Sequence, residues 1–151
     1  KTKTPDIIQH PLCIWDDKVF AVSKDSWVYA LNPLTGSILW RKKFSEDEFL
    51  IPAFSHNYML LFNDQGEGFA LNPRSAQILW TIKINAKPTL PPVICKNLFF
   101  IGTSEGLMVF DTKTMEKSIY IKGEEISALM LVGFNLYVAT SDHLTKFSTK
   151  L

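Results

Sequence analysis

The chain has 151 residues, of which 46% are hydrophobic, 13% aromatic and 21% charged, a composition typical of a folded globular domain. Sixteen Lys and Arg residues balance fifteen Asp and Glu residues, so the net charge is +1. Proteins that bind nucleic acid through its phosphates usually carry a clear basic excess, and the balance argues against that class. The longest apolar run, residues 128–139, is shorter than the roughly 20 residues that a membrane helix needs.

The N-terminal residues 1–10 are polar and form an extension without an expected element of the main fold. From residue 11 onward, short runs of β-branched and aromatic residues alternate with turn residues, which is typical of antiparallel strands. No stretch carries a helical period over three turns. The clearest expected strands are residues 19–22, 27–31, 59–62, 68–71, 98–101 and 136–139.

Two segments of the chain repeat each other at an offset of 40 residues. Residues 29–40 read YALNPLTGSILW, residues 69–80 read FALNPRSAQILW, and seven of the twelve positions are identical. A weaker third copy spans residues 109–120, and the start of a fourth at residues 136–144 echoes residues 99–107. Four short strands in each unit of roughly 40 residues indicate the blade of a β-propeller.

The repeat divides the chain into predicted blades at residues 11–50, 51–90, 91–125 and 126–151, with the last blade incomplete. We therefore predict an all-β fold with about 3.75 four-stranded blades, either half of a propeller or a fragment of a ring of about seven or eight blades. The blades at the two ends of such an incomplete propeller need a neighbour, and two arrangements would supply one. Two copies can close an eight-bladed ring as a homodimer, with residues 1–10 supplying an outer strand, or the chain is part of a longer protein. Lys1 in place of a start Met leaves open an upstream signal, lipid anchor or further protein.

Residues 30–40 resemble the tryptophan-docking repeat of the PQQ-like β-propeller family, Ala-x-Asp-x-x-Thr-Gly-x-x-x-Trp. The first copy has Asn for the Asp, and the third has Val109 for the Ala and Met115 for the Gly. In this family the large ring packs between neighbouring blades, and the turn residues shape the loop before it. The resemblance implies this blade-docking role for Ala30, Asn32, Gly36, Trp40, Ala70, Asn72, Trp80, Asp111 and Tyr120.

The family includes quinoprotein dehydrogenases, sensor domains and the BamB-type propeller lipoproteins of outer-membrane assembly, and the chain is closest in type to the last group. The resemblance implies a non-enzymatic scaffold that binds protein partners, without a cofactor, in the bacterial periplasm or at the periplasmic face of the outer membrane. Two alternatives stay open. One is a fragment of a dehydrogenase that depends on pyrroloquinoline quinone, and the other is a sensory propeller domain that binds peptides or unfolded chains.

The residues themselves offer little for catalysis or metal binding. The dehydrogenases of this family hold their cofactor against a disulfide between adjacent cysteines, whereas Cys13 and Cys95 are far apart in the sequence. We expect both to be buried small residues without a bridge. The three histidines, His10, His56 and His143, share no ligand-like spacing. We therefore predict no catalytic residue, no cofactor and no metal.

Two charge runs follow the first docking tryptophan: Arg41, Lys42 and Lys43, and then Glu46, Asp47 and Glu48. One interpretation is a solvated strand end followed by an acidic loop. The other is a patch that docks a partner protein, because loops on a rigid scaffold commonly carry binding.

Overall fold

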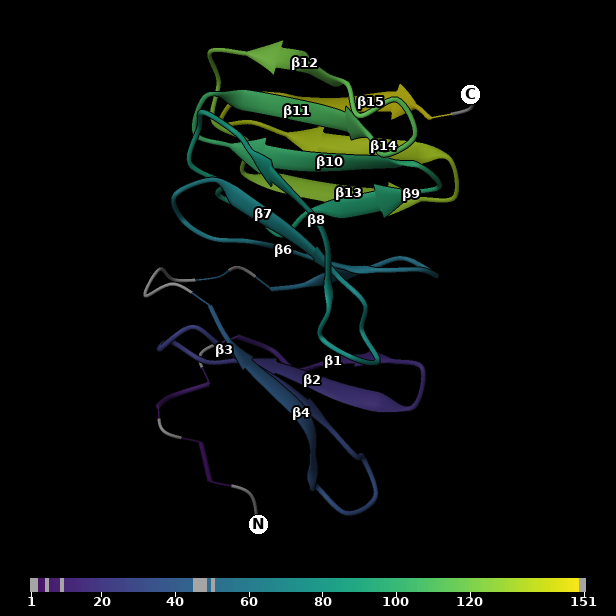
Figure 1. Cartoon of the computed structure of the whole chain (residues 1–151). Helices are drawn as coiled ribbons and strands as arrows, with labels where there is room; N and C mark the ends of the chain where they lie inside the picture. Colours follow the sequence, from purple (N-terminus) through teal and green to yellow (C-terminus); the bar gives the residue numbers. More distant parts are fainter. Residues whose placement is uncertain (1–2, 5, 9, 45–48, 50, 150–151) are drawn as a thin grey trace. The chain divides into compact units, whose positions relative to one another are not determined.

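The computed structural model describes residues 3–4, 6–8, 10–44, 49 and 51–149, and every regular element within these ranges is a β-strand (Figure 1). The strands form four separate antiparallel sheets, each built from strands that are consecutive in sequence. The predicted all-β fold of blade-like sheets is confirmed.

The sheets are numbered here in chain order. Sheet 1 consists of β1 (Cys13–Trp15), β2 (Lys18–Val22), β3 (Trp27–Leu31) and β4 (Ile38–Lys43). Sheet 2 consists of β5 (Ala53–Phe54), β6 (Met59–Phe62), β7 (Glu67–Leu71) and β8 (Ile78–Lys83). Sheet 3 consists of β9 (Val93–Cys95), β10 (Leu98–Thr103), β11 (Gly106–Asp111) and β12 (Lys117–Lys122). Sheet 4 has three described strands, β13 (Ala128–Val132), β14 (Asn135–Ala139) and β15 (Leu144–Ser148).

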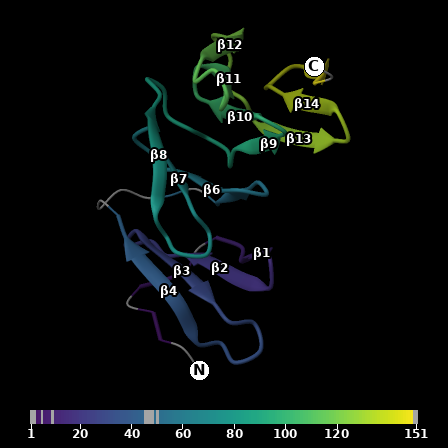
Figure 2. The same cartoon turned by 45° about the vertical axis from the view of Figure 1, so that its right-hand side comes forward.

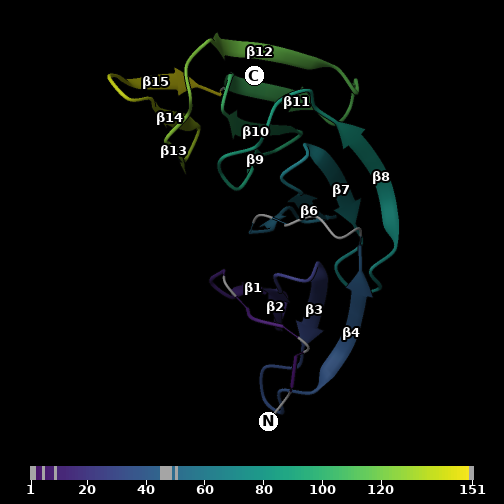
Figure 3. The same ribbon diagram turned by 90° about the vertical axis from the view of Figure 1, so that its left-hand side faces the viewer.

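The chain divides into two compact units, residues 1–83 with sheets 1 and 2, and residues 84–151 with sheets 3 and 4. In the first unit, β4 and β8 form the outer edges of their sheets (Figure 3). In the second unit, β9 of sheet 3 and β13 of sheet 4 are in contact (Figure 2). We propose that each sheet with its connections is one blade, with the residue boundaries predicted from the repeat.

The core of the first unit lies between the facing sides of sheets 1 and 2. Sheet 1 contributes Phe20, Val22, Val28 and Ala30, and sheet 2 contributes Met59, Leu61 and Leu71. Aromatic rings fill the remaining space: Phe54 packs 4.8 Å from Phe20 and 6.0 Å from Trp15, measured between ring centroids. Because aromatic side chains bury large areas, these rings add to the apolar packing that stabilises the pair of sheets.

The core of the second unit has the same plan. Phe100, Leu107 and Val109 of sheet 3 face Leu136 and Val138 of sheet 4. The side chains that point inward alternate with exposed ones along β13, as expected for a strand with one buried face.

The turns that join the third and fourth strands of sheets 1 to 3 share one conformation. Each starts with a side-chain oxygen that accepts the backbone N–H two residues further on, in Asn32, Asn72 and Asp111. The fifth residue of each turn donates its N–H back to the first carbonyl and has a positive φ. These fifth residues are Gly36 (70°), Ala76 (59°) and Met115 (60°). Only the first turn has glycine at this position, and glycine adopts a positive φ without steric cost.

The described part of the N-terminal extension lies against sheet 1 of its own chain. Ile8 forms an isolated antiparallel bridge with Ser23, and the Ile7 carbonyl accepts the N–H of Lys24 at 3.0 Å. Phe49, which leads into sheet 2, forms the same kind of bridge with Asn63. The residues from position 7 therefore enter sheet 1 as the connection between blades enters sheet 2, and the role of residues 1–10 as an outer strand stays a prediction.

Replacing Met115 with Gly is expected to stabilise the protein by about 1 kcal/mol. A left-handed backbone conformation costs a residue with a Cβ roughly 1–2 kcal/mol, and glycine avoids this cost. Part of the gain is lost because glycine loses more conformational entropy on folding. The Met115 side chain is half exposed, so little packing is lost. Urea denaturation measures the change. Gly36→Ala is the matched control and should lose a similar amount; equal stability of all three proteins would contradict the turn geometry.

Candidate functional site

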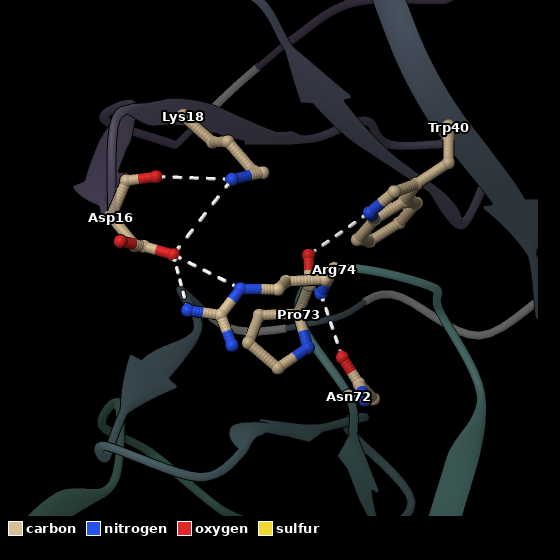
Figure 4. Close-up of polar contacts among 6 residues, drawn as sticks. All are labelled: Asp16, Lys18, Trp40, Asn72, Pro73 and Arg74. Atoms are coloured by element: carbon tan, nitrogen blue, oxygen red, sulfur yellow. Dashed lines mark hydrogen bonds and ion pairs between the residues drawn. The ribbon is translucent and has the colours of Figure 1, made fainter.

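The best-defined set of polar contacts joins sheet 1 to the last turn of sheet 2 (Figure 4). The Trp40 indole on β4 donates its Nε1–H to the carbonyl oxygen of Pro73 at 3.0 Å. The same ring meets Phe20 edge to face, with centroids 5.8 Å apart. Trp40 is therefore held on its own sheet by packing and joined to the next sheet by a hydrogen bond.

The turn that receives Trp40 is shaped by its own side chain. Asn72 accepts the backbone N–H of Arg74 at 2.9 Å, and its carbonyl accepts the N–H of Ala76, also at 2.9 Å. Such a turn forms because a short amide side chain can bond the backbone two residues ahead. It presents the Pro73 carbonyl to Trp40 of sheet 1 and directs the Arg74 side chain to Asp16, in the hairpin between β1 and β2.

Arg74 makes the second contact between the two sheets. Its Nη2 lies 2.6 Å from Oδ2 of Asp16, its Nε lies 3.1 Å from the same oxygen, and its guanidinium carbon lies 5.4 Å from the Trp15 ring centroid. Lys18 donates to the Asp16 carbonyl at 3.1 Å. The hydrogen bond from Arg74 lowers the pKa of the Asp16 carboxyl below its ordinary value, with smaller help from nearby charges. We name this set of residues, Trp15, Asp16, Trp40, Pro73 and Arg74, the inter-sheet clamp.

Each docking tryptophan lies opposite an alanine. In sheet 1 Trp40 pairs with Ala30, and in sheet 2 Trp80 pairs with Ala70. Both alanines are fully buried. The Trp80 ring meets Tyr58 of the same sheet edge to face at 5.6 Å. A small residue beneath the ring leaves room for it to lie across the sheet, which gives a physical reason for the Ala and Trp of the repeat.

Tyr120 contacts the following sheet from a different register. Val109 of sheet 3 pairs with Ser118, and Tyr120 falls where the pairing of β11 with β12 shifts by one residue. The Tyr120 ring nevertheless meets Phe147 of sheet 4 at 6.1 Å, at an interplanar angle of 84°. The offset of 40 residues thus points to an aromatic side chain that contacts the next sheet. The β-bulge sets the register from which Tyr120 makes this contact.

The basic run forms the end of strand β4. Arg41 lies over Trp27, 4.9 Å from the ring centroid, and Lys42 lies over Phe44 at 5.8 Å. Lys43 pairs with Trp27 across the strands and is exposed. Cation–π contacts hold two of the three cations at defined places on the sheet. The acidic residues predicted to lie beside them fall outside the described residues: Glu46, Asp47 and Glu48.

The two cysteines are free thiols. Cys13 is half-buried with its Sγ 3.9 Å from the Pro52 carbonyl, and burial raises the pKa of its thiol. Cys95 is buried with its Sγ 3.5 Å from Oγ1 of Thr149. A raised thiol pKa lowers the reactive thiolate fraction, so Cys13 is not activated as a nucleophile.

Among the residues that the structure describes, no set of donors matches the family's quinone cofactor. In its dehydrogenases that group is associated with adjacent cysteines and with a calcium ion held by Glu, Asn and Asp. Among the described residues, no three His, Cys, Asp or Glu side chains are arranged to hold a metal. His10, His56 and His143 belong to no such group. Within the same described part of the chain, no helix is long and apolar enough to cross a membrane.

Of the five residues in the inter-sheet clamp, only Trp40 was among the predicted site residues, and the ion pair was missed. Asp16 and Arg74 are separated by 58 positions, and neither belongs to the docking pattern. Arg74 replaces Leu34 of the first copy within an otherwise similar turn. This substitution was the one feature of the sequence that could have pointed to Arg74. Its partner Asp16 is identified only by the packing of sheet 1 on sheet 2.

Comparisons with known proteins agree with this architecture. The four sheets, their repeated turn and the aromatic residue that follows it define a β-propeller protein built from PQQ-like repeats. The family described as outer membrane protein assembly factor BamB matches residues 2–150, and the chain belongs to this family. The predicted relationship to the BamB-type propellers is confirmed. The comparison with curated proteins gives no match.

Solved structures with this fold include natural and designed propellers. BamB from Moraxella catarrhalis superposes with a TM-score of 0.73 at 17% identity, over 98% of this chain and 47% of its own. The computationally designed Ika4 protein gives 0.79 at 15% identity, over 98% of this chain and 99% of its own. Sqt1 from Saccharomyces cerevisiae gives 0.76 at 15% identity, over 88% and 42%. The chain thus spans about half the length of the BamB structure.

Substitutions at Trp40 should separate its hydrogen bond from its packing. Trp40→Phe keeps a ring and loses the bond to Pro73, and we expect a loss of about 1 kcal/mol in the free energy of unfolding. Trp40→Ala also loses the packing against Phe20 and should cost about 3 kcal/mol. Urea denaturation of the three proteins provides the measurement. Equal losses for the two variants would show that the hydrogen bond, and not the ring, holds the turn.

The Asp16–Arg74 pair should make stability depend on pH. Because folding lowers the pKa of Asp16, the contribution of the pair is complete above the pKa of the unfolded carboxyl, near pH 4, and disappears as pH falls through the folded value. Arg74→Gln should therefore lower the melting temperature more at pH 7 than in acid, where the Asp16 carboxyl of the folded protein is protonated. Lys113→Gln, at the same turn position in sheet 3, is the control. A loss that is independent of pH would contradict an ionic role for Arg74.

Proposed function

We propose that this chain is a non-enzymatic β-propeller scaffold that binds protein partners during envelope assembly, in the bacterial periplasm or at the periplasmic face of the outer membrane. The observation that carries the proposal is the membership of residues 2–150 in the BamB family. The fold by itself would not suffice, because propellers host many unrelated functions.

The rigid connections between strands suit a scaffold. The turns at Asn32, Asn72 and Asp111 are each closed by side-chain and backbone hydrogen bonds. A loop that is ordered before binding loses little conformational entropy when a partner docks. Exposed side chains on these turns, such as Lys113, can therefore contribute to binding without first being ordered.

The end of β4 is our candidate for the partner-docking surface. Arg41 and Lys43 are exposed on a strand whose position is fixed by its pairing with β3. The stacking of Arg41 on Trp27 further restricts the guanidinium group. Fixed cations attract an acidic surface and orient it, and this contribution weakens as salt screens it.

Quinone chemistry is not part of the proposal. Cys13 and Cys95 are free thiols, and the described residues hold no cluster of carboxylates suited to calcium. A titration with pyrroloquinoline quinone provides the corresponding check. A stoichiometric absorbance change would replace the scaffold with an oxidoreductase fragment.

The binding experiment uses the purified β-barrel assembly machinery of the outer membrane, immobilised and exposed to the chain. Arg41→Glu/Lys43→Glu should weaken binding at least tenfold, by removing two cations and adding two anions (about 1.4 kcal/mol or more). Lys117→Glu/Lys122→Glu makes the same change at the two ends of β12 and should leave binding within twofold. The parent affinity should fall as salt rises.

Two results would contradict this proposal. One is a parent chain that is folded by circular dichroism and does not bind the machinery, which would remove the envelope-assembly role. Alternatively both double variants could weaken binding equally, which would show attraction by overall charge without a surface at β4.

A further inference from the structure

Sheet 4 has an apolar face that points away from the core of the second unit. Met130 pairs with Tyr137, which pairs with Lys146, and these three side chains share that face. Met130 is 62% exposed, Val132 on the same strand is half exposed, and Leu144 is 74% exposed. Lys146 is the charged member of this face and is exposed. An exposed apolar sheet face is a common mark of an interaction site.

Each position on this face has an equivalent in sheet 1 that is already in contact with another sheet. The strand pairing aligns Met130 with Cys13, Val132 with Trp15, Tyr137 with Phe20, Ala139 with Val22, and Leu144 with Val28. All five sheet 1 residues pack in the core between sheets 1 and 2. The outer face of sheet 4 is therefore built on the same plan as a surface that binds the next sheet.

Sheet 1, in the first unit, has the complementary face. Its Val19 and Leu31 match Met59 and Leu71, which are the residues of sheet 2 that pack against sheet 1. Ala21 and Tyr29 on this face are already buried. The open part is Ile14, which is 79% exposed and stands where sheet 2 has Phe54, the residue that packs on Trp15 and Phe20.

The turns show the same correspondence. Leu34 occupies the place of Arg74 and is 93% exposed, and Pro33 is exposed where Pro73 is buried. Gly133 occupies the place of Asp16 in the two-residue hairpin turn, and both have a positive φ, 59° and 46°.

The chemistry of the two ends is matched. In the inter-sheet clamp, the cation of Arg74 meets the anion of Asp16. In sheet 4 the corresponding hairpin carries no acid and exposes the side chains of Val132 and Phe134. The turn of sheet 1 that corresponds to Arg74 offers an apolar leucine. The ionic contact inside the chain thus corresponds to exposed apolar side chains on sheets 1 and 4, with the Lys96 ammonium 4.8 Å from the Phe134 ring centroid.

We propose that the outer face of sheet 4 binds sheet 1 of a second copy of this chain. Ile14 and Leu34 of one copy then contact Val132 and Phe134 of the other, in the arrangement that sheets 1 and 2 show within one chain. This is the homodimer that the repeat count left open, in which each copy covers an apolar face of the other.

The first measurement is the mass of the particle by light scattering over a wide range of concentration. We expect twice the chain mass of 17.2 kDa. Leu34→Arg places a cation against Val132 and Phe134 and should weaken dimerisation at least tenfold. The melting temperature extrapolated to the dissociated chain should not change, because Leu34 makes little contact within the chain. Leu79→Arg adds the same charge to an exposed leucine of β8 and is the matched control, with no expected effect.

A second variant tests the proposed geometry directly. Leu34→Arg combined with Gly133→Asp rebuilds the Arg74–Asp16 pair between two copies. An added Cβ at Gly133 meets no atom within 4 Å, and Asp16 shows that aspartate accepts this turn conformation. The double variant should recover at least part of the lost dimer, while Gly133→Asp alone should weaken it.

Three results would overturn the inference. They are a single-chain mass at every concentration, a dimer as stable in Leu34→Arg as in the parent chain, and a double variant no better than Leu34→Arg alone. Binding of the assembly machinery at β4 is measured in a separate experiment, so the failure of either proposal does not affect the test of the other.

Discussion

The docking of one small sheet on the next is the interaction on which this fold depends. A sheet of four short strands has two faces, and it cannot bury both within itself. Phe20, Val22 and Val28 of sheet 1 become a core only because Met59 and Leu61 of sheet 2 cover them. The second unit solves the same problem with Phe100 and Leu136. Every apolar face must therefore be covered by a neighbour.

Polar contacts add orientation to this apolar packing. The Trp40 indole and the Asp16 carboxylate hold opposite sides of one turn in sheet 2, at Pro73 and Arg74. Neither contact needs to contribute much stability to be useful, because the apolar core already holds the sheets together. Their directional geometry instead restricts how sheet 2 can slide or rotate on sheet 1.

The sequence was most informative where a residue acts through its immediate neighbours. The turns at Asn32 and Asn72 could be predicted because the side-chain amide oxygen accepts the backbone N–H two residues ahead. The Ala30 and Trp40 pair belongs to the same repeat and lies in one hairpin. Tyr120 was found by its spacing, whereas its displacement by a β-bulge was not, because pairing with the neighbouring strand determines the register.

Residue pattern and repeat length were enough to predict an all-β propeller, since alternating side chains and turn residues are properties of adjacent positions. The resemblance of residues 30–40 to the tryptophan-docking repeat added the PQQ-like family. The tertiary structure decided which distant residues meet: Arg74 with Asp16, and Trp40 with Pro73. It also separated buried apolar faces from exposed ones, so that Phe20 became core while Met130 remained on the surface. The reason is physical, because burial depends on which sheet lies opposite, and no local pattern specifies that partner.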